Sequence, residues 1–140
     1  MAIYQGNIEN VNHSSQYVFD FLADFRHFEK FLPEQVTDWE ATDEYCKFGV
    51  PGMGTVKLIF LEKKPHSLIV IQPAPDSGFP VPFFLKAFLT QNENEENNST
   101  FQFVADADIH GMVALMVDGP LRQFVAIITT RLKEYLDSVK

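Results

Sequence analysis

The strongest periodic pattern in this sequence lies in residues 111–139. Apolar side chains recur there at the three- and four-residue spacing of an α-helix, and most charged side chains fall between them. The apolar set consists of Leu115, Met116, Leu121, Phe124, Val125, Ile128, Leu132, Tyr135, Leu136 and Val139. This stripe predicts a long C-terminal helix with one face packed against the rest of the domain.

The dipeptide Gly119-Pro120 interrupts this pattern. Proline lacks a backbone donor and clashes with the preceding helical turn, whereas it fits well as the first residue of a helix. We therefore expect a short helical lead-in, a bend, and then a long helix. Asp118 stands four residues before Arg122, so it either pairs with Arg122 or caps the second segment, and capping is the favoured interpretation.

The rest of the chain predicts strands around two short helices. Tyr17, Val18, Phe21, Leu22 and Phe25 recur at helical spacing, and a second helix over residues 25–32 ends at a proline, with a bend near Asp24. Short apolar runs bounded by turn residues predict the strands. Their ranges are 4–11, 36–42, 45–50, 54–63, 67–72, 83–91 and 99–109.

The strand at 99–109 alternates most clearly. Phe101, Phe103, Ala105, Ala107 and Ile109 share one face, and this face should turn toward the core. Its side chains change from large to small along the strand. Small residues opposite a helix either allow a close approach or leave space, and the sequence leaves both open.

Composition limits the possible classes of protein. The 140 residues fit one domain spanning 1–140, and 46% of them are hydrophobic, which is enough to form a core. The 14 Phe residues suit either an apolar ligand cavity or an ordinary core. A net charge of −8 argues against nucleic acid and against electrostatic docking on anionic lipid.

The sequence lacks targeting and membrane-spanning patterns and contains a single cysteine. No basic start followed by an apolar run resembles a signal peptide, and no stretch approaches about 20 apolar residues. We expect a cytoplasmic protein without stable membrane insertion. The single cysteine, Cys46, excludes an internal disulfide, and its place in an apolar strand favours packing over catalysis.

Four segments carry a resemblance to a known superfamily. They are residues 15–22, residues 28–33, the turn 51–54 that opens a strand, and residues 120–124 in the last helix. In this order of elements, the chain resembles the START-related helix-grip superfamily (SRPBCC), which includes lipid-transfer domains, plant hormone and pollen-allergen proteins, and polyketide cyclases. The resemblance spans essentially the whole chain. It implies an α+β helix-grip fold, with a curved antiparallel sheet of about seven strands around the last helix.

The same resemblance implies a cavity between the sheet and the C-terminal helix, filled by a lipid, sterol, polyketide or other apolar molecule. We expect its lining to include Phe83, Leu85, Phe101, Phe103, Met116, Phe124, Val125 and Ile128. His110 and Arg122 are candidate polar contacts, the latter as an anchor for a carboxylate. The proline-rich loop 73–82, which contains Phe79, is a candidate for a stiff gate over the cavity.

Three function classes remain open from the sequence, and binding of a small apolar ligand is favoured. No nucleophile motif is present, and no two histidines have the spacing of a zinc pair, so we expect neither a metal nor another cofactor. A cyclase or dehydratase using His110 or Asp106 is the first alternative. A protein-interaction module with a filled interior is the second. We expect a monomer or a homodimer.

Overall fold

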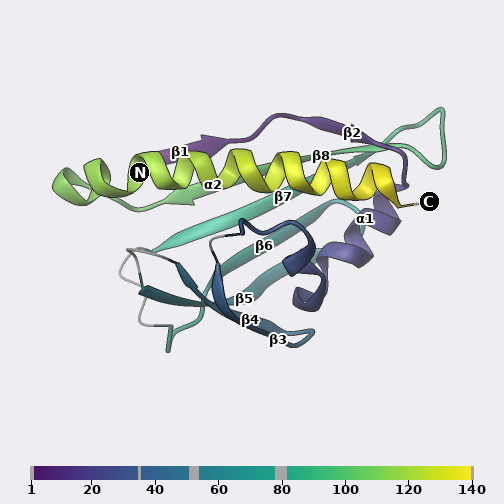
Figure 1. Cartoon of the computed structure of the whole chain (residues 1–140). Helices are drawn as coiled ribbons and strands as arrows, with labels where there is room; N and C mark the ends of the chain where they lie inside the picture. Colours follow the sequence, from purple (N-terminus) through teal and green to yellow (C-terminus); the bar gives the residue numbers. More distant parts are fainter. Residues whose placement is uncertain (1, 35, 51–53, 78–81, 140) are drawn as a thin grey trace.

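A computed structural model describes residues 2–34, 36–50, 54–77 and 82–139. One curved sheet of eight antiparallel strands lies beside a long helix, α2, which runs along it (Figure 1). The strand order is β1-β8-β7-β6-β5-β4-β3, and β2 also pairs with β8. The elements are β1 (Ala2–Gln5), β2 (Glu9–Val11), α1 (Ser15–Leu22), the 3₁₀ helix η1 (Phe25–Lys30), β3 (Thr37–Ala41), β4 (Tyr45–Val50), β5 (Gly54–Lys64), β6 (Leu68–Pro73), β7 (Phe83–Gln91), β8 (Ser99–Ala107) and α2 (Gly111–Ser138).

The α+β helix-grip architecture predicted from the sequence is confirmed, with one more strand than expected. The expected first strand is divided into β1 and β2, which both pair with β8. Gly6 lies between them, where a Cβ would stand 2.5 Å from Thr129 Oγ1 of α2. The backbone therefore touches the helix at this point, and only glycine allows that approach.

The expected break in the last helix is wrong. α2 continues through Gly119 and Pro120 as one helix of 28 residues. Pro120 cannot donate a hydrogen bond to the turn before it, but the residue four positions earlier, Met116, is 74% exposed, so water can replace the missing donor. Asp118 consequently lies inside the helix and does not cap it.

Helix continuity also corrects the predicted apolar stripe. The buried face of α2 is set by residues such as Val125, Ile128 and Leu132. At about 100° per residue, Leu115 and Met116 lie about 140° and 120° from Ile128 around the helix axis, whereas Val117 lies within about 20°. Val117 is accordingly buried, and Leu115 and Met116 face outward.

One end of the interior is filled by aromatic side chains from α1, η1, the sheet and α2. Phe31 is central, because its ring lies 4.9 Å from Phe28, 6.1 Å from Phe21 and 6.0 Å from Phe103. Phe101 packs edge-on against Phe103 at 5.6 Å. These contacts account for much of the phenylalanine content as packed core.

α2 is long and apolar enough to cross a bilayer by length and composition alone. A core helix passes the same test. Here the inward face of α2, from Val117 through Ile128 to Leu136, is buried against the sheet. This packing is consistent with a core helix, although only 17% of its most apolar 18-residue window is buried.

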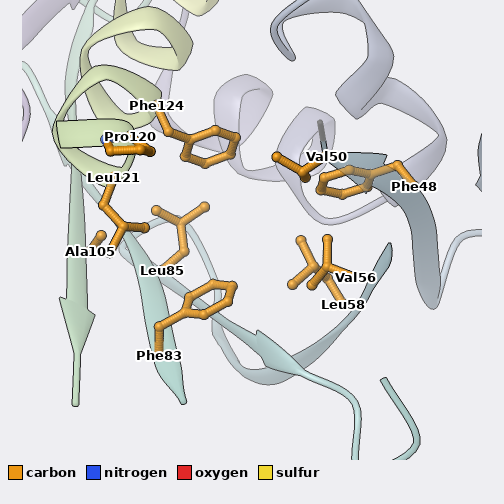
Figure 2. A pocket seen from close by; sticks show the side chains of 10 residues that line it. All are labelled: Phe48, Val50, Val56, Leu58, Phe83, Leu85, Ala105, Pro120, Leu121 and Phe124. Carbon is orange, nitrogen blue, oxygen red and sulfur yellow. The ribbon is translucent and has the colours of Figure 1, made fainter. Parts of the chain in front are cut away.

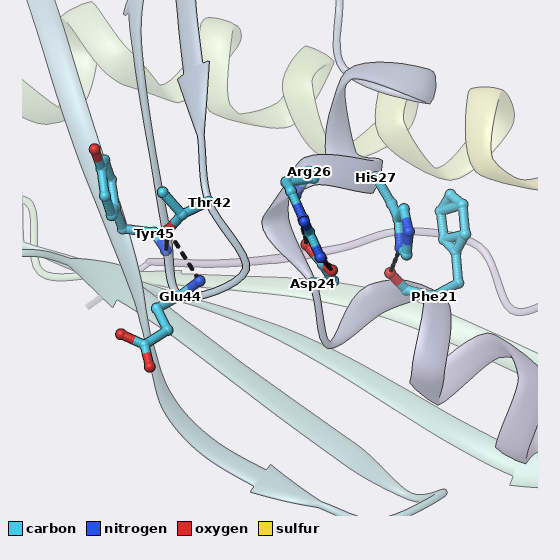
Figure 3. A network of polar contacts seen from close by, with 7 residues as sticks. All are labelled: Phe21, Asp24, Arg26, His27, Thr42, Glu44 and Tyr45. Atoms are coloured by element: carbon cyan, nitrogen blue, oxygen red, sulfur yellow. Dashed lines mark hydrogen bonds and ion pairs between the residues drawn. The ribbon is translucent and has the colours of Figure 1, made fainter.

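The start of η1 is fixed by Asp24 (Figure 3). Its Oδ1 accepts from the Arg26 backbone N–H at 2.9 Å, and its Oδ2 accepts from Arg26 Nη2 at 2.6 Å. The hydrogen bonds from the Arg26 side chain lower the pKa of Asp24 to about 2, and the bond from the Arg26 backbone adds to this effect. Ionised Asp24 therefore stabilises the folded state above about pH 4, and this contribution is lost as the pH falls through about 2.

We predict that Asp24→Asn, which keeps an acceptor for the helix start, lowers the free energy of unfolding near neutral pH by less than about 1 kcal/mol, because Arg26 is exposed. The difference between variant and wild type should shrink as the pH falls to about 2. Urea unfolding at several pH values measures it. Arg26→Gln should give the same profile, and a difference that stays constant with pH would contradict the assignment.

Candidate functional site

A cavity of about 110 Å³ lies between residues 120–124 of α2 and the end of the sheet opposite the aromatic cluster (Figure 2). Strands β4, β5, β7 and β8 supply its walls, and α2 covers it. Its lining consists of Phe48, Val50, Val56, Leu58, Phe83, Leu85, Ala105, Pro120, Leu121 and Phe124. The sheet and the helix thus enclose a space that their side chains do not fill.

The cavity begins where the inward face of β8 changes from large to small side chains. Phe101 and Phe103 fill the aromatic end, and Ala105 follows two residues later on the same face. Ala105 pairs with Leu85 of β7, and both side chains line the cavity. The sequence left open whether the small residues of this strand allow the helix to approach closely or leave space. At Ala105 they leave space.

The lining offers hydrocarbon contact almost exclusively. Three Phe rings and aliphatic groups surround the space, and none of the ten side chains around it, all within the described part of the chain, is titratable. Pro120 is exposed, and Phe83, Leu121 and Phe124 are half-buried, so the cavity opens to the surface beside α2. The arrangement can bury an apolar group, and it offers no acid, base or nucleophile.

The structure brings three of the residues expected from the sequence to this cavity: Phe83, Leu85 and Phe124. Sequence reasoning missed Phe48 and Val50 on β4, Val56 and Leu58 on β5, and Ala105, Pro120 and Leu121. The β4 and β5 residues form two short apolar alternations on either side of residues 51–53, and this alternation was the available signal.

The other five expected lining residues lie elsewhere. Phe101, Phe103 and Ile128 are fully buried in the packed core, where aromatic and aliphatic neighbours occupy the space around them. Val125 faces a separate cavity, and Met116 is exposed because of the helical phase described above. None of these five residues lines the apolar cavity of Figure 2.

The two expected polar contacts do not reach the apolar cavity. His110 is exposed, and its Nε2 lies 2.8 Å from Asp108 Oδ1. Arg122 lines a second, polar cavity of about 150 Å³ between β1 and α2. There its guanidinium lies 3.3 Å from Asp118 and over the ring of Tyr4, whose hydroxyl donates to Asp118 at 2.9 Å. Burial and this bond raise the pKa of Tyr4.

The cysteine packs in the core, and the described acidic residues form no candidate metal site. Cys46 is fully buried in β4, and burial raises the pKa of its thiol to about 12, so the thiol stays protonated and unreactive. Among the residues that the structure describes, no three His, Cys, Asp or Glu side chains form a possible metal site. The proposed gate residue Phe79 and the turn residues 51–53 lie outside the described residues.

Comparisons with known proteins bear on the fold. No protein-family model and no curated protein matches this chain. Among solved structures, a START superfamily protein from Mycobacterium smegmatis is similar with a TM-score of 0.70 and 9% identity, covering 99% of both chains.

Two further solved structures are similar to the same extent. Norcoclaurine synthase from Thalictrum flavum, in complex with dopamine and hydroxybenzaldehyde, gives a TM-score of 0.68 and 10% identity over 99% of this chain and 88% of that one. The Aha1 dimer from Colwellia psychrerythraea gives 0.69 and 15% over 98% and 97%. At these identities the similarity concerns architecture, and the chain therefore has the START-like helix-grip fold.

Proposed function

We propose that this protein binds a small, neutral, apolar molecule, or the apolar end of a larger one, in the cavity beneath α2. The observation that carries the proposal is the lining: ten described side chains from four strands and one helix, none of them titratable, around an unfilled space. Water gains few partners in such a space, whereas an apolar group gains contact and loses unfavourable hydration.

The volume limits the size of the bound group. A dry cavity of about 150 Å³ lined by Leu, Ile and Phe holds a benzene molecule. At about 110 Å³ with an opening beside Pro120, this cavity suits one ring or a short branched chain. A longer molecule would leave its remainder outside the cavity, so the lipids and sterols expected by resemblance would enter by one end only.

The enzymatic alternative has less support. A cyclase or dehydratase needs a titratable group that faces its substrate. Asp106 alternates with the inward residues Ala105 and Ala107, and its neighbour across the sheet is the exposed Phe84, so it lies on the outer face. His110 pairs with Asp108 at the surface. Neither Asp106 nor His110 therefore faces the cavity, where a catalytic acid or base would have to lie.

Toluene, followed by methyl NMR, tests the proposal. Titration should shift the methyl signals of Val56, Leu58 and Leu85 around the cavity and leave those of Leu132 and Leu136 in the packed core unchanged. Benzoate, which adds a carboxylate to the same ring, should not bind, because the lining offers no cation. Absence of any shift up to the solubility limit of toluene, or equal binding of benzoate, would contradict the proposal.

A further inference from the structure

The first two turns of α2 present apolar side chains to solvent. Met112, Val113, Leu115 and Met116 are 80%, 47%, 83% and 74% exposed, and we call these four residues the lead-in face. Figure 1 has this end of the helix at the left, reaching past the strands. Most of the exposed large apolar side chains elsewhere in the described chain stand singly, whereas these four lie within five consecutive positions. Exposed apolar surface gathered in this way is typical of an interaction site.

The chemistry of the lead-in face is uniform. No charged side chain occurs between Gly111 and Val117, so the face cannot recognise a partner by charge. The nearest carboxylate on each side along the chain belongs to Asp108, which contacts His110, and to Asp118, which pairs with Arg122. Together with a net charge of −8, the two carboxylates would repel an anionic surface.

We propose that the lead-in face docks the protein reversibly on an electrically neutral lipid surface, such as a zwitterionic bilayer. A helix turn whose exposed side is wholly apolar lowers its free energy by placing those side chains at the boundary between head groups and acyl chains. Methionine suits this task because its flexible side chain adapts to an irregular surface. Because the face carries no basic residue to attract anionic lipid, we expect it to prefer a neutral surface.

A second copy of the chain is a poorer occupant for this face. A stable protein interface needs about 800 Å² and about 20–30 residues from each partner. The lead-in face consists of four side chains at the end of one helix. Its area therefore matches a shallow contact with lipid better than a stable homodimer.

The lead-in face lies close to the opening of the apolar cavity. Pro120, Leu121 and Phe124 of the same helix line the apolar cavity, and Leu121 follows Met116 by five residues, which is about 7.5 Å along the axis. Docking would bring the cavity opening close to the lipid. The docking itself does not depend on the proposed ligand, so the two proposals can fail separately.

Flotation with phosphatidylcholine vesicles tests the docking. The wild type should float with these vesicles and float less when phosphatidylserine is included. The double variant Leu115→Gln, Met116→Gln should lose at least tenfold in bound fraction, and its thermal unfolding midpoint should not change, because both side chains are exposed. A matched control, Ile8→Gln with Leu61→Gln, replaces two similarly exposed apolar residues outside the face and should float like the wild type.

Three outcomes would overturn the docking: no flotation of the wild type, flotation that the double variant retains, or equal loss in the control variant. Sedimentation gives a fourth such outcome. If the wild type is a dimer and the double variant is a monomer, the face binds a second copy of the chain. Toluene titration of the double variant separates the proposals. Normal toluene shifts without flotation leave the cavity binding intact, and flotation without toluene shifts leaves the docking intact.

Discussion

Replacing Ala105 with leucine should lower the affinity for toluene by at least tenfold while leaving the stability of the protein almost unchanged. Ala105 lies on the cavity wall, and the added carbons would occupy the space that a ligand needs. The same atoms would fill a void, so burial would offset any local crowding. The toluene titration measures the affinity, and urea unfolding measures the free energy of unfolding.

Ala87 provides the matched control. It is an equally buried alanine on the inward face of the sheet, but its partners are Phe103 and Ile69, in the part of the core that is already filled. Ala87→Leu should therefore destabilise the protein by about 1–3 kcal/mol through overpacking and leave toluene binding intact. If Ala105→Leu costs as much stability as Ala87→Leu, the space beside Ala105 is not a cavity.

Removal of the Phe103 ring should destabilise the fold far more than it affects ligand binding. Phe103 is 1% exposed and contacts Phe31 and Phe101, so Phe103→Ala leaves a void in a packed cluster and should cost about 3–5 kcal/mol. Urea unfolding measures this loss. Toluene affinity, measured below the unfolding transition, should fall less than threefold.

Phe124→Ala is the complementary variant. Its ring is half-buried at the cavity, so its loss should cost less stability than that of Phe103 and reduce toluene affinity severalfold. The reverse outcome, in which Phe103→Ala abolishes binding with little loss of stability, would restore Phe103 to the ligand site that its sequence pattern suggested.

Much of the fold could be predicted from local patterns. The inward face of β8 follows from strict alternation, and the bend between α1 and η1 follows from Asp24 and the two apolar faces beside it. These features depend on neighbours in sequence, whose geometry is fixed by the helix and strand repeats.

The cavity could be predicted only in part, because its walls meet through pairings that the sequence does not specify. Phe48 faces Val56 across β4 and β5, far from Leu85 and Ala105 along the chain. Phe101 and Phe103 fitted the predicted lining by residue type. The ring of Phe31, at the end of η1, packs against Phe103, and this tertiary contact left no trace in the local pattern.

The helix error has a different physical origin. Gly119-Pro120 is a helix breaker by propensity, yet the cost of Pro120 depends on whether water can reach the turn before it. Exposure is a property of the folded chain. Once the helix is continuous, its phase turns Leu115 and Met116 outward, and the lead-in face results.

If the proposed binding holds, the graded face of β8 would let this fold change its ligand without losing its architecture. Phe101 and Phe103 pack in the aromatic cluster, whereas Ala105, two residues further on along the same face, lines the cavity. Under selection, the range of bound molecules can therefore diverge while the aromatic end stays constant, and ligand preference can evolve faster than the fold that holds it.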